Sequence, residues 1–197
     1  MTKTVDYYMS PTSPWTYLGH ARFAEIAKAA GATVMIKPIN VGEVFAVTGG
    51  LPLGKRHPAR QAYRLVELER WRTHLDVPLT MHPKFFPAND EPARRLIEAA
   101  RQAGADAMGL AHALLRAVWA EERDIADHDT LAAILGENGL SADLFAAADG
   151  QAVTDEIAAS TAQAIERNVI GVPNYYVDGK PHWGQDRLDF VQRALKG

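Results

Sequence analysis

Strand patterns occur only near the two ends of this 197-residue chain, and the long stretch between them reads as helix. β-Branched and aromatic residues predict four strands, over residues 3–9, 33–39, 174–177 and 180–183. A helix with one apolar face, over residues 14–30, separates the first two strands. Asp178-Gly179, a dipeptide typical of two-residue turns, joins the last two into a hairpin. Asp186 then caps a final helix.

The middle of the chain is expected to be helical, after a glycine-rich loop or broken helix over 40–57. The predicted helices cover 58–75, 92–103, 108–118, two short segments capped by Asp129 and Ser141, and 153–168. The element order is therefore β-α-β, a block of helices, and β-β-α. These two halves form the core of a thioredoxin-like fold, with the first two strands parallel. We predict an α/β chain with a thioredoxin-like domain, residues 1–57 and 169–197, and a helical insertion domain, residues 58–168.

Composition excludes several kinds of partner. The net charge of −3 is spread over both signs, whereas a nucleic-acid surface needs a basic stripe. No apolar run is long enough to span a membrane, and the N-terminus lacks the apolar segment of a signal peptide. We therefore expect a cytoplasmic protein with neither a nucleic-acid nor a membrane partner. The seven histidines show no metal-binding spacing, so we expect no metal site and place them on the surface.

The chain contains no cysteine. This composition excludes disulfide bonds, a cysteine nucleophile and cysteine-based zinc sites. A disulfide oxidoreductase is excluded as well, because the chain has no sulfur to exchange.

Ser13 lies at the start of the first predicted helix. It precedes Pro14, a residue suited to the first helical position, so the local pattern makes Ser13 an N-cap. Capping alone would explain the residue. A hydroxyl can also accept from helix N–H groups while its hydrogen points to another atom, so capping is compatible with a functional role.

Short segments along nearly the whole chain resemble one known family. They are Ser13-Pro14-Trp15-Thr16-Tyr17-Leu18, Thr48-Gly49, Arg60 with Tyr63, Arg70-Trp71, Ile165-Glu166-Arg167, Gly171-Val172-Pro173 and Trp183-Gly184-Gln185-Asp186-Arg187-Leu188. In this order and at these spacings they resemble the 2-hydroxychromene-2-carboxylate isomerase family. That family is akin to the kappa-class glutathione transferases and to the DsbA-type bacterial disulfide oxidases. The resemblance implies a DsbA-like thioredoxin fold and glutathione as the cofactor.

The resemblance also implies a role for Ser13 as the catalytic residue. Redox relatives carry two cysteines where this chain has Ser13 and Thr16, so the site could hold a thiolate but could not oxidise it. A free thiol has a pKa of roughly 8.5. The positive end of a helix dipole and a hydroxyl hydrogen bond both favour the thiolate, and together they lower that pKa. Ser13 would thus stabilise the glutathione sulfur, which is the nucleophile.

The remaining glutathione contacts are carried over from the same resemblance. They are Val172, Pro173, Trp183, Gly184, Gln185 and Asp186. In the resembled fold the bond before the proline is cis, and the preceding backbone pairs with the cysteinyl part of glutathione. Gln185 with helix N–H groups suits the γ-glutamyl carboxylate, and Asp186 suits the ammonium. Taken alone, the same residues read as a strand-start proline, strand packing and an N-cap.

The resembled isomerases bind their electrophilic substrate between the thioredoxin core and the helical insertion. The candidates to line that cleft here are Trp15, Phe45, Arg60 and Asn89, each of which could equally be core or surface. Two departures concern the substrate. Gly50 stands where the family often has asparagine, and Ser10-Pro11 stands where the close isomerases have an acidic and an aromatic residue.

The sequence thus predicts a glutathione-dependent isomerase of the 2-hydroxychromene-2-carboxylate type. Ring opening and cis–trans isomerisation would give a trans-o-hydroxybenzylidenepyruvate-like 2-oxo acid, a step of aromatic catabolism. The expected partners are glutathione, a small aromatic-derived organic acid and, by analogy, a second copy in a homodimer. Two alternatives stay open: a kappa-class-like transferase that conjugates glutathione to an electrophile, and a non-catalytic thioredoxin-like module that holds a peptide at the Val172-Pro173 edge.

Overall fold

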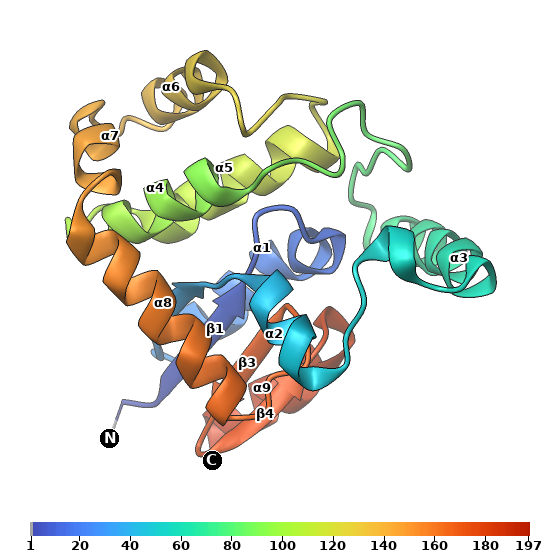
Figure 1. Ribbon diagram of the computed structural model, residues 1–197. Helices are drawn as coiled ribbons and strands as arrows, with labels where there is room; N and C mark the ends of the chain where they lie inside the picture. Colours follow the sequence, from blue (N-terminus) through green and yellow to red (C-terminus); the bar gives the residue numbers. More distant parts are fainter. Residues whose placement is uncertain (1) are drawn as a thin grey trace.

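The computed structural model describes residues 2–197. Its four strands form one mixed sheet in the order β2-β1-β3-β4. The strands are β1 (Thr4–Met9), β2 (Thr33–Pro38), β3 (Asn174–Val177) and β4 (Lys180–Trp183). β1 runs parallel to β2 and antiparallel to β3, so the two ends of the chain meet at the centre of the sheet (Figure 1). The predicted thioredoxin-like fold is confirmed.

The described helices are α1 (Pro14–Ala29), α2 (Val41–Thr48), α3 (Pro58–Leu75), α4 (Glu91–Gln102), α5 (Ala107–Trp119), α6 (His128–Glu137), α7 (Asp143–Ala148), α8 (Gln151–Glu166) and α9 (Leu188–Lys196). Short 3₁₀ turns, η1 (Leu53–Lys55) and η2 (Gln185–Arg187), precede α3 and α9. None of the helices within residues 2–197 has both the length and the apolar character that crossing a bilayer requires.

Three predicted helix caps are wrong by one or two residues. Asp127, not Asp129, caps α6, and its carboxylate accepts from the Thr130 N–H at 2.8 Å. Asp186 lies inside η2 and does not cap α9. At both of these helix starts several acidic or polar residues follow one another, so the local pattern does not show which one leaves the extended conformation first. Ala142, not Ser141, is the N-cap of α7, although the Ser141 hydroxyl accepts from the Asp143 N–H at 3.1 Å.

Adjacent tyrosines on β1 point to opposite faces of the sheet, because side chains alternate along a strand. Tyr7 packs with Phe23 of α1 and Tyr175 of β3, with ring centroids 4.7 and 5.3 Å away. Tyr8 belongs to a second buried cluster, and its hydroxyl donates to Gln163 of α8 at 2.6 Å. α1 therefore covers one face of the sheet and α8 covers the other.

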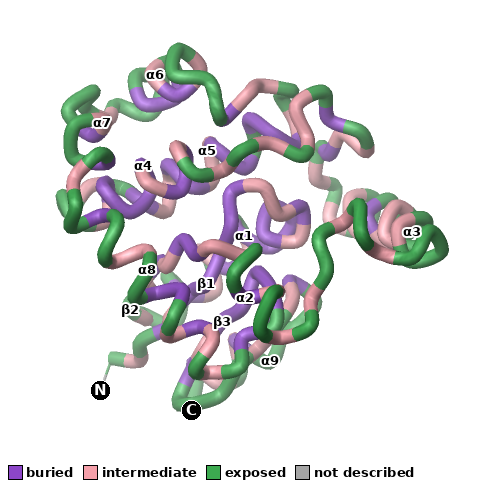
Figure 2. The backbone as a smooth tube through the Cα atoms, in the orientation of Figure 1, coloured by how far each residue is buried: buried purple, intermediate pink, exposed green. Residues whose placement is uncertain are grey.

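The larger buried cluster runs from the sheet and α1 into the helical part of the chain. It includes Leu114 and Trp119 of α5, both fully buried. Figure 2 shows buried backbone along α4 and α5. α4 contacts α5, α7 and α8 and also packs against β2. The sheet and the helices of 58–168 share this core, and the division of the chain into two domains stays a prediction.

One histidine is not on the surface as expected. His20 of α1 is 2% exposed, and its two ring nitrogens lie 3.0 Å from the Tyr7 hydroxyl and from the Met108 carbonyl oxygen of α5. A carbonyl only accepts, so Nε2 donates to Met108 and Nδ1 accepts from Tyr7. Burial lowers the pKa of His20 to about 4, and the ring is neutral at physiological pH.

We expect stability to fall in acid because of His20. Its pKa is about 4 in the folded chain and 6.5 as the ordinary value, so the unfolded chain binds the proton more readily between these values. Stability is complete above pH 6.5 and is lost as the pH falls towards 4. Lowering the pH from 7 to 5 should cost about 2 kcal/mol through this residue. Urea unfolding at both pH values should show a smaller pH dependence in His20→Gln; an equal dependence would contradict the assignment.

Gly19 sets how closely α1 approaches Tyr175 of β3 and Gln185 of η2. A Cβ at this position would lie 2.7 Å from Gln185 Cβ and 2.9 Å from the Tyr175 hydroxyl oxygen. Gly19→Ala should therefore lower the free energy of unfolding. Overpacking costs about 1–3 kcal/mol, whereas the higher helix propensity of alanine stabilises by only about 1 kcal/mol. Gly136→Ala in α6, where nothing lies within 4 Å, is the matched control and should be stabilising. Urea unfolding of both variants measures the contrast, and an equal gain in both would refute it.

Candidate active site

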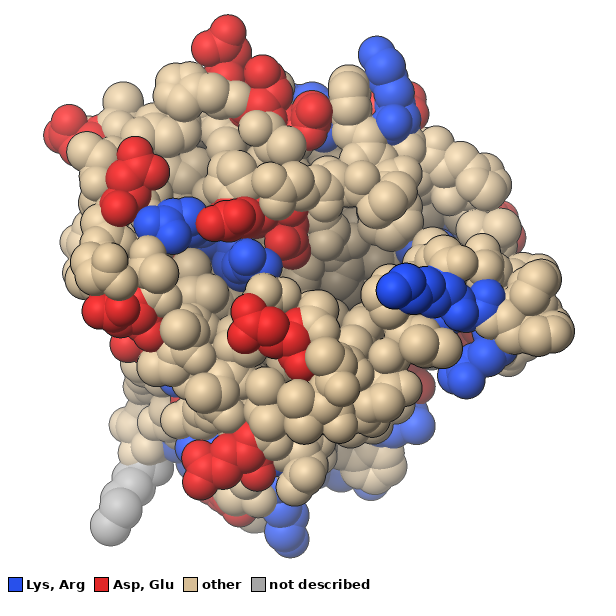
Figure 3. All heavy atoms as spheres, in the orientation of Figure 1, with Lys and Arg blue, Asp and Glu red and all other residues tan. Residues whose placement is uncertain are grey.

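A cavity of about 620 Å³ opens where the start of α1 meets α2, η1, α3 and the segment that leads into α4. Figure 3 shows this hollow, with Lys and Arg side chains along its α3 side. Six of the predicted site residues line it, from both the glutathione and the substrate sets: Ser13, Trp15, Phe45, Arg60, Val172 and Trp183. The other five are not among its lining residues: Asn89, Pro173, Gly184, Gln185 and Asp186.

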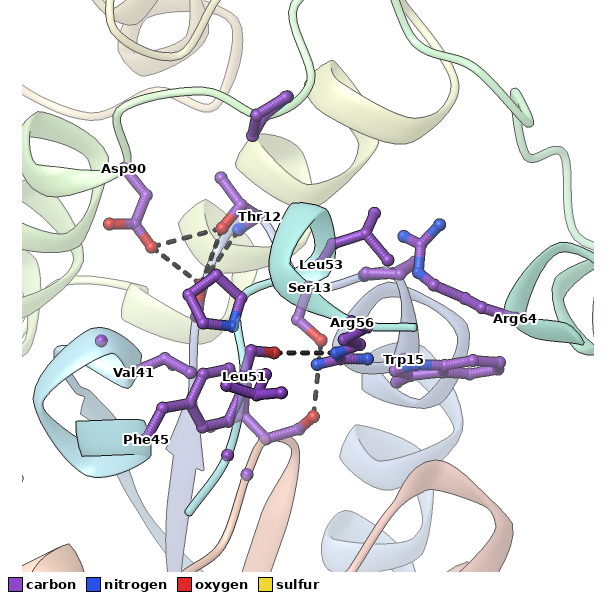
Figure 4. Close-up of a pocket in the computed structure, with 18 of the residues that line it drawn as sticks. Thr12, Ser13, Trp15, Val41, Phe45, Leu51, Leu53, Arg56, Arg64 and Asp90 are labelled. Atoms are coloured by element: carbon purple, nitrogen blue, oxygen red, sulfur yellow. Dashed lines mark hydrogen bonds between the residues drawn. The ribbon is translucent and has the colours of Figure 1, made fainter. Parts of the chain in front are cut away.

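Ser13 caps α1 in an extended conformation and faces the cavity (Figure 4). Its Oγ accepts from the Thr16 N–H at 3.1 Å. The same Oγ lies 3.5 Å from the Val172 carbonyl oxygen, a long distance for a hydroxyl donor. The hydroxyl hydrogen is thus held only weakly, and Ser13 can donate to an anion in the cavity while it caps the helix.

The Val172-Pro173 bond is cis, as the family resemblance implies. Val172 is 9% exposed and lines the cavity next to the Ser13 hydroxyl. Pro173 does not line the cavity, and its carbonyl accepts from the Gly184 N–H at 2.9 Å. The cavity wall at this point is therefore the backbone and side chain of Val172.

Trp183 reaches the cavity by packing over Gly171. A Cβ on Gly171 would lie 2.9 Å from the Trp183 indole nitrogen, so this approach needs glycine. Gln185 is 2% exposed, and its Oε1 accepts from Arg22 at 2.8 Å. The Asp186 carboxylate is partly exposed and pairs with Arg187 at 2.6 Å. Both polar groups predicted for the γ-glutamyl end already have partners within the chain.

Asn89 is exposed and binds only a neighbouring backbone group at the start of α4. Its Oδ1 accepts from the Glu91 N–H at 3.2 Å. The neighbouring Asp90, which the sequence analysis did not select, is the residue that lines the cavity.

Asp90 joins α4 to the turn before α1. Its Oδ2 accepts from the Ser10 hydroxyl at 2.8 Å and lies 3.4 Å from the Thr12 hydroxyl. Its other oxygen pairs with Arg94 Nη1 at 3.0 Å. Ser10 occupies a position where the resembled isomerases carry a different residue, and here a carboxylate arrives from a segment eighty residues away. Arg94 stands four residues after Asp90, a local spacing, but no local pattern connects Asp90 with Ser10 or Thr12, so the sequence offered no signal for that link.

Three arginines make one wall of the cavity positive. Arg56 follows η1, and Arg60 and Arg64 lie one turn apart on α3. Burial, and then the charge of Arg60, lower the pKa of Arg56. Only Arg60 was predicted, although the i, i+4 spacing of Arg60 and Arg64 was visible in the sequence.

The ring of Phe45 occupies the space beside Gly50, where the resembled family often has asparagine. A Cβ on Gly50 would come within 2.9 Å of three atoms of that ring. Both residues line the cavity. Glycine at position 50 therefore allows an aromatic wall here, in place of an amide side chain.

Gly50→Asn should lower the free energy of unfolding by about 1–3 kcal/mol, because the new side chain collides with the Phe45 ring. In a Phe45→Ala background the same change should cost much less, since the colliding ring is gone. Urea unfolding of the four proteins in this double-mutant cycle gives the coupling between the two sites. Strictly additive effects would show that the ring does not limit position 50.

Comparisons with known proteins agree with this architecture. The family model for the DSBA-like thioredoxin domain matches residues 4–196. A 2-hydroxychromene-2-carboxylate isomerase from Sphingobium xenophagum is 31% identical over 197 residues, which cover 99% of each chain. An enzyme of the same name from Pseudomonas putida is also 31% identical, over 97% of this chain and 93% of its own.

A solved structure of 2-hydroxychromene-2-carboxylate isomerase has the same fold. It superposes with a TM-score of 0.81 at 28% identity, covering 98% of this chain and 94% of the other. The relatives are isomerases by name, in agreement with the predicted enzyme class. The chain therefore belongs to the DSBA-like thioredoxin family and to the 2-hydroxychromene-2-carboxylate isomerase family.

Proposed function

We propose that this chain is a glutathione-dependent isomerase that acts on 2-hydroxychromene-2-carboxylate or a close analogue. The observation that carries the proposal is the placement of Ser13. Its hydroxyl lies at the N-terminus of α1, its hydrogen has no short acceptor, and it opens into a cavity large enough for two small ligands. The names of the relatives support the reaction, and the site supports the cofactor.

The residues around Ser13 fit the central part of glutathione. Within residues 2–197 no backbone hydrogen bond engages Val172, and its carbonyl oxygen has only the long 3.5 Å contact with the Ser13 hydroxyl. Its N–H and C=O could therefore pair with a peptide in an extended conformation. The γ-glutamyl end fits less directly, because Arg22 already holds the Gln185 side chain. Asp186 keeps part of its carboxylate exposed and could bind the ammonium.

Glutathione supplies, when bound, a thiol that adds reversibly to a conjugated carbon and so makes a double bond rotatable. Ser13 would donate its hydroxyl hydrogen to the sulfur, and the N–H groups of the first turn of α1 would add partial positive charge. Thr16 is fully buried, its hydroxyl has no hydrogen-bond partner among residues 2–197, and it is not among the residues that line the cavity. The chain would therefore use a single hydroxyl where redox relatives use two sulfurs.

The cavity suits a flat acid as the second ligand. Trp15, Phe45 and Phe86 offer apolar surface, and the arginine wall attracts negative charge. The cytoplasmic location and the homodimer inferred from the sequence belong to the same proposal.

Ser13→Ala should reduce turnover of 2-hydroxychromene-2-carboxylate by about 100-fold or more, the usual loss when one donor to a reacting anion is removed. It should also cost about 1 kcal/mol of stability through the lost cap. The matched control is Ser141→Ala, since that hydroxyl accepts from the Asp143 N–H at 3.1 Å near the start of α7 and does not line the cavity. Absorbance assays with glutathione measure turnover. Unchanged turnover in Ser13→Ala would contradict the proposed role of the Ser13 hydroxyl.

Two further measurements separate the alternatives. Mass spectrometry of the product distinguishes isomerisation, which leaves the substrate mass unchanged, from conjugation, which adds glutathione. Thermal unfolding with glutathione tests for binding, because a ligand at 100 times its dissociation constant stabilises by about 2.7 kcal/mol. The absence of any shift at millimolar glutathione would favour a non-catalytic binding module.

A further inference from the structure

Arg64 is a partly buried cation that has no anionic partner in the part of the chain that the structure describes. It projects from α3 towards the cavity that Ser13 also lines (Figure 4). Within residues 2–197 its guanidinium makes neither a salt bridge nor a hydrogen bond, and its Nη2 is buried without a partner. A buried donor without an acceptor is costly, so this arrangement calls for a physical reason.

Two aromatic rings hold the Arg64 guanidinium in place. Its central carbon lies 5.4 Å from the centroid of Phe86 and 5.7 Å from that of Trp119. These contacts orient the group and partly remove it from water. Burial, followed by the charge of Arg56, lowers the pKa of Arg64 to about 10. The side chain is still protonated at neutral pH.

Other partly buried arginines in this protein have oxygen acceptors. Five of them pair with carboxylates: Arg72 with Glu69, Arg94 with Asp90, Arg101 with Glu98, Arg123 with Glu137 and Arg167 with Asp6. Arg22, Arg56 and Arg95 lack a carboxylate but donate to amide, carbonyl or hydroxyl oxygens. Arg64 differs from all eight, and its neighbours on the cavity wall, Arg56 and Arg60, are cations too.

We propose that Arg64 binds the carboxylate of the electrophilic acid that shares the cavity with glutathione. This inference rests on the proposed function and makes Arg64 a specificity-determining residue. A guanidinium held in a fixed plane can offer a carboxylate paired donors, and an arriving anion would satisfy a charge that the chain leaves unpaired. Phe86, which orients Arg64, also lines the cavity and provides an apolar surface for the conjugated part of the same ligand.

The position of Arg64 favours the acid over glutathione as the source of this carboxylate. The features that fit the glutathione peptide, Ser13 and Val172, come from α1 and from the segment before β3. Arg64 belongs to α3, and the rings that hold it, Phe86 and Trp119, come from the helical part of the chain. The two ligands would thus be held from different elements.

The test compares an acid with its neutral analogue. Calorimetry would measure the binding of trans-cinnamate and of its amide to the wild type, to Arg64→Met and to the matched control Arg70→Met. Arg70 lies on the same helix, exposed and paired with Glu67, outside the cavity. We expect Arg64→Met to weaken cinnamate binding about 10- to 100-fold, the factor for losing a hydrogen bond to a charged group, and to leave the amide unchanged. Arg70→Met should bind both as the wild type does.

Several outcomes would overturn the assignment. Arg64→Met could keep the preference for the acid, or it could raise only the KM for glutathione, which would assign Arg64 to the tripeptide. If Arg64→Met does not fold by circular dichroism, Arg64→Gln makes the same comparison with an uncharged polar side chain. Failure of the proposed function looks different: the wild type would not isomerise the substrate, yet its preference for cinnamate would still depend on Arg64.

Discussion

The packing of α1 against the middle of the sheet determines where the candidate active site lies. Phe23, Tyr7 and Tyr175 form one buried aromatic group, with ring centroids 4.6 to 5.3 Å apart. His20 ties the same helix to α5 through the Met108 carbonyl. With its middle held from both sides, α1 has little freedom to tilt, and its first turn projects past the end of β1. The Ser13 hydroxyl owes its position to contacts made two or more turns further along the helix.

Much of this framework could be predicted from the sequence, because its signals are local. The four strands, the Asp178-Gly179 turn and the start of α1 at Pro14 each depend on neighbouring residues. Asp178 and Gly179 both have positive φ, as a tight hairpin requires. Ser13 and Val172 could be selected because they stand in short motifs shared with a known family. Local chemistry and family resemblance pointed to the same turn.

The rest of the site could not be predicted, because it depends on contacts between distant segments. Asp90 meets Ser10 and Thr12 only after the chain has folded, across about eighty residues. The unpaired state of Arg64 is likewise a property of the whole molecule, since it follows from which carboxylates do not reach it. For Gln185 the prediction failed in the other direction. The sequence suggested a side chain free to bind glutathione, but in the folded chain the Gln185 side chain accepts a hydrogen bond from Arg22.

The link between Asp90 and the turn before α1 has a consequence for how such chains diverge. One carboxylate on the α4 side accepts from Ser10, lies close to the Thr12 hydroxyl and neutralises Arg94. The helical part of the chain therefore cannot be exchanged between homologues independently of the turn before α1. In a chimera whose helical part came from a homologue, the hydroxyls of Ser10 and Thr12 would lose their acceptor unless that homologue also had an acidic residue at position 90. Residues 10, 12, 90 and 94 should accordingly change together over evolution, as one inherited unit.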